Sequence, residues 1–374
     1  MGKKVLFVTP NDIYDEYGIG GVKGTRKNYK LIAEYFGKEN TYLCTFPKKE
    51  HTLPPQDAVT FKRTQNNMQY MFAALLGCKV YFPWNESEIL DYIDTKNIDL
   101  LFIDSSIMGR LVRVKKKYKS IVFFHNIETD YAWNKVKKEG IWFLPSYLAS
   151  KYNDKLSTKA DAVICINERD SKRLFSLYGR QADFILPVTF EDIFAQNFTT
   201  SSYKREILFV GSLFPPNQLS IEWFMQEVMP KLNNIHLHIV GKYFESKKEE
   251  YEKRKNVYVI GSVNQLDVYY YQYAAVVLPI RYGAGMKVKT AEAMMYGRRI
   301  FATDEALEGY DVDNVSGIVR CNSADDFANA INHYFDKEDK KTFEPEVRAR
   351  FLEKYETGRI VNEFNSFLNN LLDD

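Results

Sequence analysis

Short apolar runs alternate with amphipathic segments through the first half of the chain. The runs are rich in β-branched and aromatic residues, which is typical of strands covered on both faces of a parallel sheet. They lie at residues 4–9, 41–46, 97–104, 120–125 and 159–166. The segments between them predict helices, including one from Thr25 to Phe36, one in the lysine-rich stretch 111–119 and one that begins after Asn167.

The alternation begins again after residues 187–203, where the apolar pattern lapses and polar residues gather. The second half carries predicted strands at residues 206–211, 236–241, 257–261, 275–279 and 299–303. Predicted helices lie between them at residues 217–232, 265–273 and 287–297. An amphipathic pattern over residues 347–372 predicts one long final helix.

These elements predict an α/β fold with two Rossmann-like parallel-sheet domains that face each other across a cleft. We assign residues 1–190 to the N-terminal domain and residues 191–350 to the C-terminal domain. Residues 351–374 are expected to form a C-terminal helix that crosses back and packs on the first domain. Since open α/β sheets bind ligands at the carboxyl ends of their strands, we expect the site there.

Composition narrows the classes of partner. The chain has 51 basic and 49 acidic residues and a net charge of +2, which gives no overall attraction for nucleic acid. No apolar run approaches the roughly 18 residues that span a bilayer, and the N-terminus lacks a signal-peptide pattern, so we expect a cytoplasmic protein. Four cysteines without a CxxC pair predict free thiols. His236 and His238 share a strand face, but no third ligand is near in sequence, so no metal site is expected there.

The segment 278–308 carries the most informative chemistry. Before its predicted helix stands a glycine-rich turn made of Gly283, Ala284, Gly285 and Met286. Lys287 and Lys289 fall in the first helical turn, and free N–H groups, close backbone approach and two cations together suit a diphosphate. Glu292 lies on nearly the same helical face as Lys289 and can accept hydrogen bonds from a ribose diol. The set predicts a nucleotide site, and the alternative is two solvated lysines beside a surface glutamate.

The N-terminal half offers two further groups. Gly20 and Gly21 belong to a glycine-rich loop, residues 18–24, whose N–H groups can face a phosphate at the start of the next helix. His125 ends a predicted strand, at the carboxyl edge, where it can hydrogen-bond a ligand. Glu128 can orient a ligand hydroxyl or help remove its proton. The alternatives are a plain turn, a core or loop histidine and a solvated glutamate.

Two basic stretches lie in the same half, at residues 113–119 and 135–138. The second is close to four aromatic residues, Trp133, Trp142, Phe143 and Tyr147. Lysines interleaved with aromatic side chains suit an anionic membrane surface or a lipid-linked acceptor. Solvated helix faces are the alternative.

The segment Gly283–Gly297 (GAGMKVKTAEAMMYG) resembles the donor-binding signature of the glycosyl transferases group 1 family, which are retaining enzymes with the two-domain GT-B fold. Shorter stretches similar to family landmarks are Gly20-Gly21, His125–Glu128, Phe209–Ser212, Pro216-Asn217 and Glu308-Gly309. The resemblance therefore covers nearly the whole chain. It departs from the family at Ala284, where many members have a glutamate that contacts the transferred sugar. The backbone of residues 283–286 can take over that contact.

The resemblance implies a retaining, metal-independent glycosyltransferase that moves a sugar from a nucleotide-sugar donor to a glycan or lipid-linked acceptor. The C-terminal domain would hold the donor and the N-terminal domain the acceptor. The expected setting is bacterial cell-surface polysaccharide synthesis, in the cytoplasm or peripherally at the inner face of the membrane, with no cofactor besides the donor.

Carried onto this sequence, the resemblance implies three catalytic residues, His125, Glu128 and Lys289. The implied donor-binding residues are Gly20, Gly21, Gly211, Ser212, Gly283, Ala284, Gly285, Met286, Lys287, Lys289 and Glu292. Two other functions stay open: a nucleotide-sugar epimerase, and a nucleotide-sugar-binding protein without turnover. A nicotinamide-dependent oxidoreductase is disfavoured, because Lys23 stands where the dinucleotide fingerprint requires its third glycine.

Overall fold

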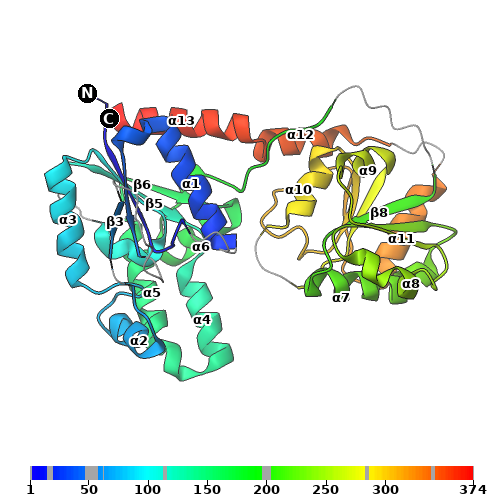
Figure 1. The fold of residues 1–374 in the computed structure, drawn as a ribbon, viewed down its shortest axis with the longest axis horizontal. Helices are drawn as coiled ribbons and strands as arrows, with labels where there is room; N and C mark the ends of the chain where they lie inside the picture. The colour runs from blue at the N-terminus through cyan, green and yellow to red at the C-terminus, as the bar shows by residue number, and fades with distance from the viewer. Residues whose placement is uncertain are drawn as a thin grey trace. The chain divides into compact units, whose positions relative to one another are not determined.

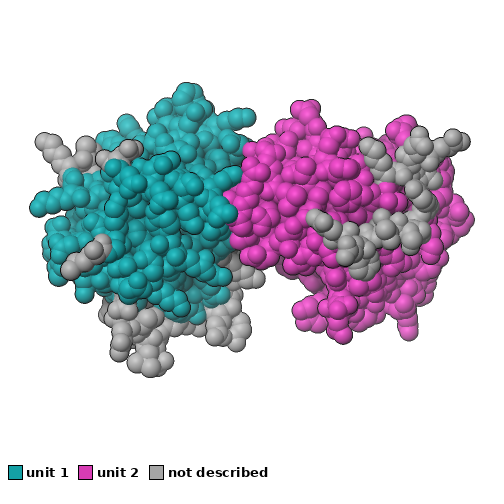
Figure 2. Space-filling model, turned by 90° about the horizontal axis from the view of Figure 1, so that it is seen from above, with its two compact units in different colours: residues 1–188, 361–374 teal, residues 189–360 magenta. Residues whose placement is uncertain are grey.

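The computed structural model describes residues 2–14, 20–46, 58–61, 63–112, 116–195, 204–282, 286–337 and 342–373. The chain divides into two compact units, residues 1–188 with 361–374, and residues 189–360 (Figures 1 and 2). Each unit is a Rossmann-like α/β layer structure built on a parallel sheet. The predicted fold class of two parallel-sheet domains is therefore confirmed.

The first unit holds a seven-stranded sheet in the order β3-β2-β1-β4-β5-β6-β7. Its strands are β1 (Val5–Thr9), β2 (Thr41–Thr45), β3 (Ala58–Thr60), β4 (Leu100–Ile103), β5 (Lys119–Phe124), β6 (Ala162–Cys165) and β7 (Phe184–Ile185). Its helices are α1 (Gly20–Phe36), α2 (Asn67–Leu75), α3 (Trp84–Lys96), α4 (Glu128–Glu139), α5 (Leu144–Ser157) and α6 (Glu168–Tyr178). The central strands are buried along their length, as their continuous apolar runs predict.

The second unit holds a six-stranded parallel sheet in the order β10-β9-β8-β11-β12-β13. Its strands are β8 (Glu206–Val210), β9 (His236–Val240), β10 (Val257–Gly261), β11 (Ala275–Leu278), β12 (Arg299–Ala302) and β13 (Ile318–Arg320). Its helices are α7 (Pro215–Trp223), α8 (Lys248–Tyr251), α9 (Asp267–Gln272), α10 (Val288–Met295), α11 (Ala324–Asp336) and α12 (Pro345–Lys354).

Both sheets reverse their strand order at one point, between β1 and β4 in the first unit and between β8 and β11 in the second. The connections that leave the two strands at such a point run to opposite sides. Open α/β sheets bind ligands outside the carboxyl ends of these strands. The segments that follow β1, β4, β8 and β11 are therefore the first places to examine for a site.

The last helix, α13 (Thr357–Asp373), belongs to the first unit from residue 361 onward, as the predicted crossing back requires. Its Phe364 and Phe367 rings lie 5.5 and 5.2 Å from the Phe184 ring. The prediction of one unbroken helix over residues 347–372 is wrong, because α12 ends at Lys354 and α13 starts at Thr357. The Glu356 carboxylate accepts hydrogen bonds from the N–H groups of Gly358 and Arg359, which caps the new start.

Two other predicted helices differ from the structure. In the lysine-rich stretch 111–119 the described residues form no α-helix, and the connection is a 3₁₀ segment, η2 (Ser106–Leu111). This segment packs so closely on α5 that a Cβ atom at Gly109 would lie 2.1 Å from the Asn153 carbonyl oxygen. The predicted helix 217–232 divides into α7, a π-helical turn and a 3₁₀ turn that contains Pro230, which has no N–H to donate.

The close approach of β8 and β9 generates a stability prediction. Gly241 has φ +147°, and a Cβ atom there would lie 1.7 Å from the Gly211 carbonyl oxygen. We expect Gly241→Ala to destabilise the second unit by about 5 kcal/mol or more, since backbone atoms must move apart. Gly140→Ala is the control: φ is +99° but nothing lies within 4 Å, so it should cost only the backbone strain, about 1–3 kcal/mol. Calorimetry that finds equal effects would contradict this packing.

Candidate functional site

Gly211 and Lys289 flank the point where the second sheet reverses its strand order. Gly211 directly follows β8, and Lys289 stands in the first turn of α10, which follows β11. A Cβ atom at Gly211 would lie 3.2 Å from the Lys289 Nζ and 2.9 Å from the side-chain nitrogen of Asn217. The absence of a side chain at position 211 therefore leaves room beside the ammonium group.

The Lys289 ammonium is largely buried but forms no ion pair with a carboxylate in the described ranges. It donates a hydrogen bond to the side-chain oxygen of Asn217 and lies 5.4 Å from the centre of the Phe209 ring. Burial, together with the charge of Lys287, lowers the pKa of Lys289 to about 8, although Glu292 opposes the shift. Within the described ranges no carboxylate lies in ion-pair contact with this lysine. An anion that reached the group would supply the missing countercharge.

Lys287, at the N-cap position of α10, is held differently. Its ammonium lies 2.6 Å from Glu305 and 3.2 Å from Glu308, and only 10% of its side chain is exposed. The hydroxyl of Tyr310 donates to its carbonyl oxygen at 2.8 Å. Lys287 thus ties the start of α10 to the segment after β12, and a phosphate would compete with two carboxylates for it.

Glu292 lies one turn after Lys289, and its Oε2 accepts a hydrogen bond from the buried Tyr270 hydroxyl at 3.0 Å. Burial raises the pKa of Glu292, against the opposing effects of Tyr270 and Lys289. Tyr270 itself stacks on Tyr296 with ring centres 4.8 Å apart. The Glu292 side chain is therefore oriented by a buried aromatic pair before any ligand binds.

The other predicted donor residues of this unit have simpler surroundings. The carbonyl of the exposed Ser212 accepts from the Asn217 side chain at 2.9 Å, which fixes the turn between β8 and α7. Met286 is half-buried and packs on the apolar core of the unit. Gly283, Ala284 and Gly285 lie outside the described residues.

In the first unit, His125 meets a fully buried carboxylate. Its Nε2 lies 3.2 Å from Asp104 Oδ2, and 21% of its side chain is exposed. Asp104, at the end of β4, also accepts hydrogen bonds from Thr25 at 2.6 Å and from Asn28 at 2.8 Å, both in α1. Burial alone would lower the pKa of His125, but the Asp104 carboxylate outweighs it and the net shift is upward. The His125 ring, which is partly exposed, is thus held in a fixed direction by the Asp104 carboxylate.

The glycine-rich loop is shorter than predicted, since α1 begins at Gly20 and not at Thr25. Gly20 and Gly21 form the first turn of this helix. A Cβ atom at Gly24 would lie 3.5 Å from the His125 ring. The start of α1, Asp104 and His125 are therefore brought together at the reversal point of the first sheet.

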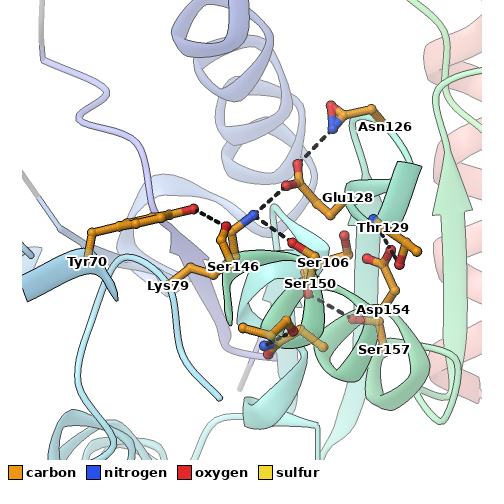
Figure 3. Close-up of polar contacts among 12 residues, drawn as sticks. Tyr70, Lys79, Ser106, Asn126, Glu128, Thr129, Ser146, Ser150, Asp154 and Ser157 are labelled. Carbon is orange, nitrogen blue, oxygen red and sulfur yellow. Dashed lines mark hydrogen bonds and ion pairs between the residues drawn. The ribbon is translucent and has the colours of Figure 1, made fainter. Parts of the chain in front are cut away.

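Glu128 is the first residue of α4 and belongs to a network of polar contacts (Figure 3). Its Oε2 accepts from the Lys79 ammonium at 2.9 Å and its Oε1 from the Asn126 amide at 2.7 Å. Burial would lower the pKa of Lys79, but Glu128 more than compensates and the pKa is raised. Since Lys79 also donates to Ser150, this cation is firmly positioned. The ion pair suits Glu128 to orienting a hydroxyl better than to removing a proton.

Sequence reasoning missed the partners that position the predicted side chains. Asn217 is noted above only as a family landmark, and Tyr270 and Lys79 are absent from the predicted site, as are the α1 residues that bond Asp104. None of them carries a local signal, because each meets its partner across a long stretch of sequence. Thr129, the residue after Glu128, donates to the Asp154 carboxylate from its N–H and hydroxyl groups (Figure 3), and burial raises the pKa of Asp154 to about 6.

The described residues include no cluster that could hold a metal ion and no helix that could cross a membrane. The chain has one Asp-x-Asp pair, Asp311 and Asp313, whose carboxylates lie 3.2 and 2.6 Å from Arg350 and Arg320. Among the described residues, no group of three or more histidine, cysteine or acidic side chains could hold a metal ion. In the same ranges, every helix falls short of the length and apolar character needed to cross a bilayer.

The comparisons with known proteins agree with this architecture. Residues 204–337 match the family model described as Glycosyl transferases group 1, so the predicted resemblance is confirmed for the second unit. A Klebsiella pneumoniae protein described as "Uncharacterized 44.6 kDa protein in cps region" is 25% identical over 244 residues, which are 60% of this chain and 59% of that protein.

Solved glycosyltransferase structures of the GT-B fold match nearly the whole chain. Sucrose-phosphate synthase from Thermosynechococcus elongatus has a TM-score of 0.62 at 16% identity over 99% of this chain and 100% of its own. The lipopolysaccharide outer core galactosyltransferase WaaB has a TM-score of 0.64 at 14% identity, with 98% and 99% covered. HepE of Anabaena in complex with UDP has a TM-score of 0.60 at 12% identity, with 98% and 100% covered. At these identities the likeness shows the fold alone.

The Asp104–His125 contact generates a titration prediction. The Asp104→Asn variant loses the negative charge that raises the pKa of His125, while the lowering effect of burial remains. The pKa of His125 should therefore fall below its wild-type value. NMR titration can follow this, because the chain has only five histidines and His125→Gln assigns the signal. His238, whose pKa burial lowers to about 4, is the internal control and should not change. An unaltered His125 titration in a folded variant would rule out the electrostatic coupling.

Proposed function

We propose that this chain, whose residues 204–337 match the glycosyl transferases group 1 model, is a retaining, metal-independent glycosyltransferase that uses a nucleotide-sugar donor. The observation that carries the proposal is the largely buried ammonium of Lys289, which forms no ion pair with a carboxylate of the described residues. It lies beside Gly211, where the second sheet reverses its strand order. This is where an α/β sheet receives a nucleotide, and the charge matches a diphosphate.

The donor roles follow from the neighbours of Lys289. Gly211 and Ser212 allow the diphosphate to approach the backbone, and Asn217 holds the ammonium in place. Glu292, kept in position by Tyr270, accepts hydrogen bonds from the ribose. The turn predicted for residues 283–286 contributes N–H groups, and Lys287, paired with Glu305 and Glu308, anchors the start of α10.

The transfer itself requires little covalent chemistry from the protein. The bond between the anomeric carbon and the diphosphate oxygen breaks as the acceptor hydroxyl oxygen bonds to the same carbon from the same face. The acceptor proton passes to the leaving phosphate oxygen. Lys289 and the start of α10 stabilise the charge that develops on the diphosphate, which is the main catalytic contribution. No metal is needed in this scheme, because the lysine provides the cation.

The first unit serves the sugar and the acceptor. His125, oriented by Asp104, hydrogen-bonds an oxygen of the transferred sugar or of the acceptor. Glu128, fixed by Lys79, orients the acceptor hydroxyl. Gly20 and Gly21 at the start of α1 present N–H groups to the donor phosphates.

The acceptor is proposed to be a glycan or lipid-linked glycan of a bacterial cell-surface polysaccharide, made on the cytoplasmic side of the membrane. The support is the similarity to a protein of a cps region and to a galactosyltransferase of the lipopolysaccharide outer core. The structural neighbour solved with UDP makes UDP the first nucleotide to test.

Loss of the Lys289 charge provides the first test. A thermal-shift screen of UDP, GDP, dTDP and ADP with their sugars identifies the donor by mass action. With that donor, Lys289→Ala and Lys289→Met should weaken nucleoside diphosphate binding by about 10- to 100-fold in calorimetry. Lys255→Ala, at an exposed lysine of the same unit, is the control and should bind as wild type. Equal affinity in all four proteins would exclude the phosphate role.

The lowered pKa of Lys289 predicts a pH dependence. Below about pH 8 the free protein already carries the charged lysine. At higher pH, binding the diphosphate requires uptake of a proton, so affinity should fall by up to about tenfold per pH unit. Calorimetry in buffers of different ionisation enthalpy measures that uptake directly. In Lys289→Met, the dependence of affinity on pH above pH 8 and the proton uptake should both disappear. If either remains, another group is responsible for it.

Product stereochemistry tests the reaction class. We expect NMR of the first glycoside formed to show the anomeric configuration of the donor, and inversion would remove the retaining assignment. Two rivals predict different results with the same reagents. An epimerase would convert the donor to an isomeric nucleotide sugar without acceptor, whereas a non-catalytic binding protein would bind the donor and leave it intact with every acceptor.

A further inference from the structure

Helix α2 presents an unusual apolar face to solvent. Met68, Phe72 and Leu75 follow one another at helical spacing and are 82%, 53% and 71% exposed. Ala73 and Ala74 turn inward and are buried. Between residues 64 and 85 the single charged residue is Lys79, which is itself buried against Glu128. An exposed helix normally turns polar side chains outward, so this face suits an apolar environment.

Further exposed apolar side chains continue this face onto neighbouring elements. Tyr70 of α2 is bonded to Ser146 of α5 at 2.8 Å, so the two helices are adjacent. Leu148 of α5 is 55% exposed, and Ile141 and Trp142, in the 3₁₀ turn η3 (Ile141–Phe143) that leads into α5, are both 77% exposed. Figure 1 shows α2 and the connection between α4 and α5 at the same end of the first unit. We call Met68, Phe72, Leu75, Ile141, Trp142 and Leu148 the apolar surface.

Exposed lysines lie beside the apolar surface on α4 and α5. The segment 131–159, which contains most of α4 and all of η3 and α5, has six lysines and two acidic residues, and one of the two, Asp154, is buried. In the described part of the chain, the exposed Lys138, Lys151 and Lys155 contact no carboxylate. Apolar side chains framed by unpaired cations match the interface of an anionic lipid bilayer, where the acyl boundary is apolar and the headgroups are negative. A second copy of this chain would bring the same positive charge.

We propose that the apolar surface inserts into the interface of an anionic lipid membrane, with Ile141 and Trp142 entering first and the lysines contacting lipid phosphates. The inference deepens the proposed function, because a lipid-linked acceptor lies in such a membrane. It does not depend on catalysis: none of the six side chains belongs to the candidate site, so membrane binding and transfer can fail separately.

Vesicle flotation tests the proposal with the full chain. Vesicles of phosphatidylethanolamine with about 30% phosphatidylglycerol should bind the protein, vesicles of phosphatidylcholine should not, and salt should weaken binding. The double variant Ile141→Ser with Trp142→Ser should reduce the partition coefficient by about tenfold or more. The double variant Phe72→Ser with Leu75→Ser should have a similar effect on the coefficient. Lys151→Gln with Lys155→Gln should reduce it by about fivefold per lysine. The control is Phe175→Ser, at a ring of α6 that is 53% exposed and should bind as wild type.

The melting temperature of each variant shows that it is folded. On binding, the tryptophan emission of the wild type should shift to the blue as Trp142 inserts, and this shift should be lost in Trp142→Ser. Absence of wild-type binding to anionic vesicles would overturn the proposal, as would variants that bind equally well. Sedimentation that shows a wild-type dimer, dissociated by Ile141→Ser with Trp142→Ser, would assign the surface to a second copy instead. If vesicles bind while no donor is used, the membrane inference stands and the proposed transferase activity falls.

Discussion

A lysine ammonium that the fold largely removes from water, without an ion-paired carboxylate in the described part of the chain, is the feature on which the proposed chemistry depends. Desolvating a cation is costly, and the cost appears as the lowered pKa of Lys289. The groups around it are a glycine, an amide oxygen and an aromatic ring. None of these neutralises the charge, so a bound diphosphate would relieve a penalty that the free protein carries.

The ionisable groups of the first unit that belong to the candidate site already have partners before any ligand arrives. His125 faces the buried Asp104, and Glu128 faces the buried Lys79. Such pairs orient side chains well but contribute little net charge toward a ligand. In the proposed transfer, the second unit therefore supplies uncompensated charge for the leaving group, and the first unit supplies fixed directions for hydroxyl groups.

The apolar pattern predicted the two parallel sheets because strands buried on both faces read as continuous apolar runs. It predicted the interruptions poorly. The break before α13 depends on the Glu356 carboxylate bonding N–H groups, and the short η2 segment depends on close packing at Gly109. Likewise, the sequence could identify Lys289 as a site residue from its place at a helix start. The hydrogen bonds of Lys289 to Asn217 and of Glu292 to Tyr270 could not be predicted, because both partners are distant in sequence.

The most direct measurement is a crystal structure of the protein with the nucleoside diphosphate that stabilises it best. We predict a phosphate oxygen within hydrogen-bond distance of the Lys289 Nζ, next to the Gly211 backbone, with the ribose hydroxyls on Glu292. A diphosphate bound elsewhere, with Lys289 still bonded only to Asn217, would contradict the central claim.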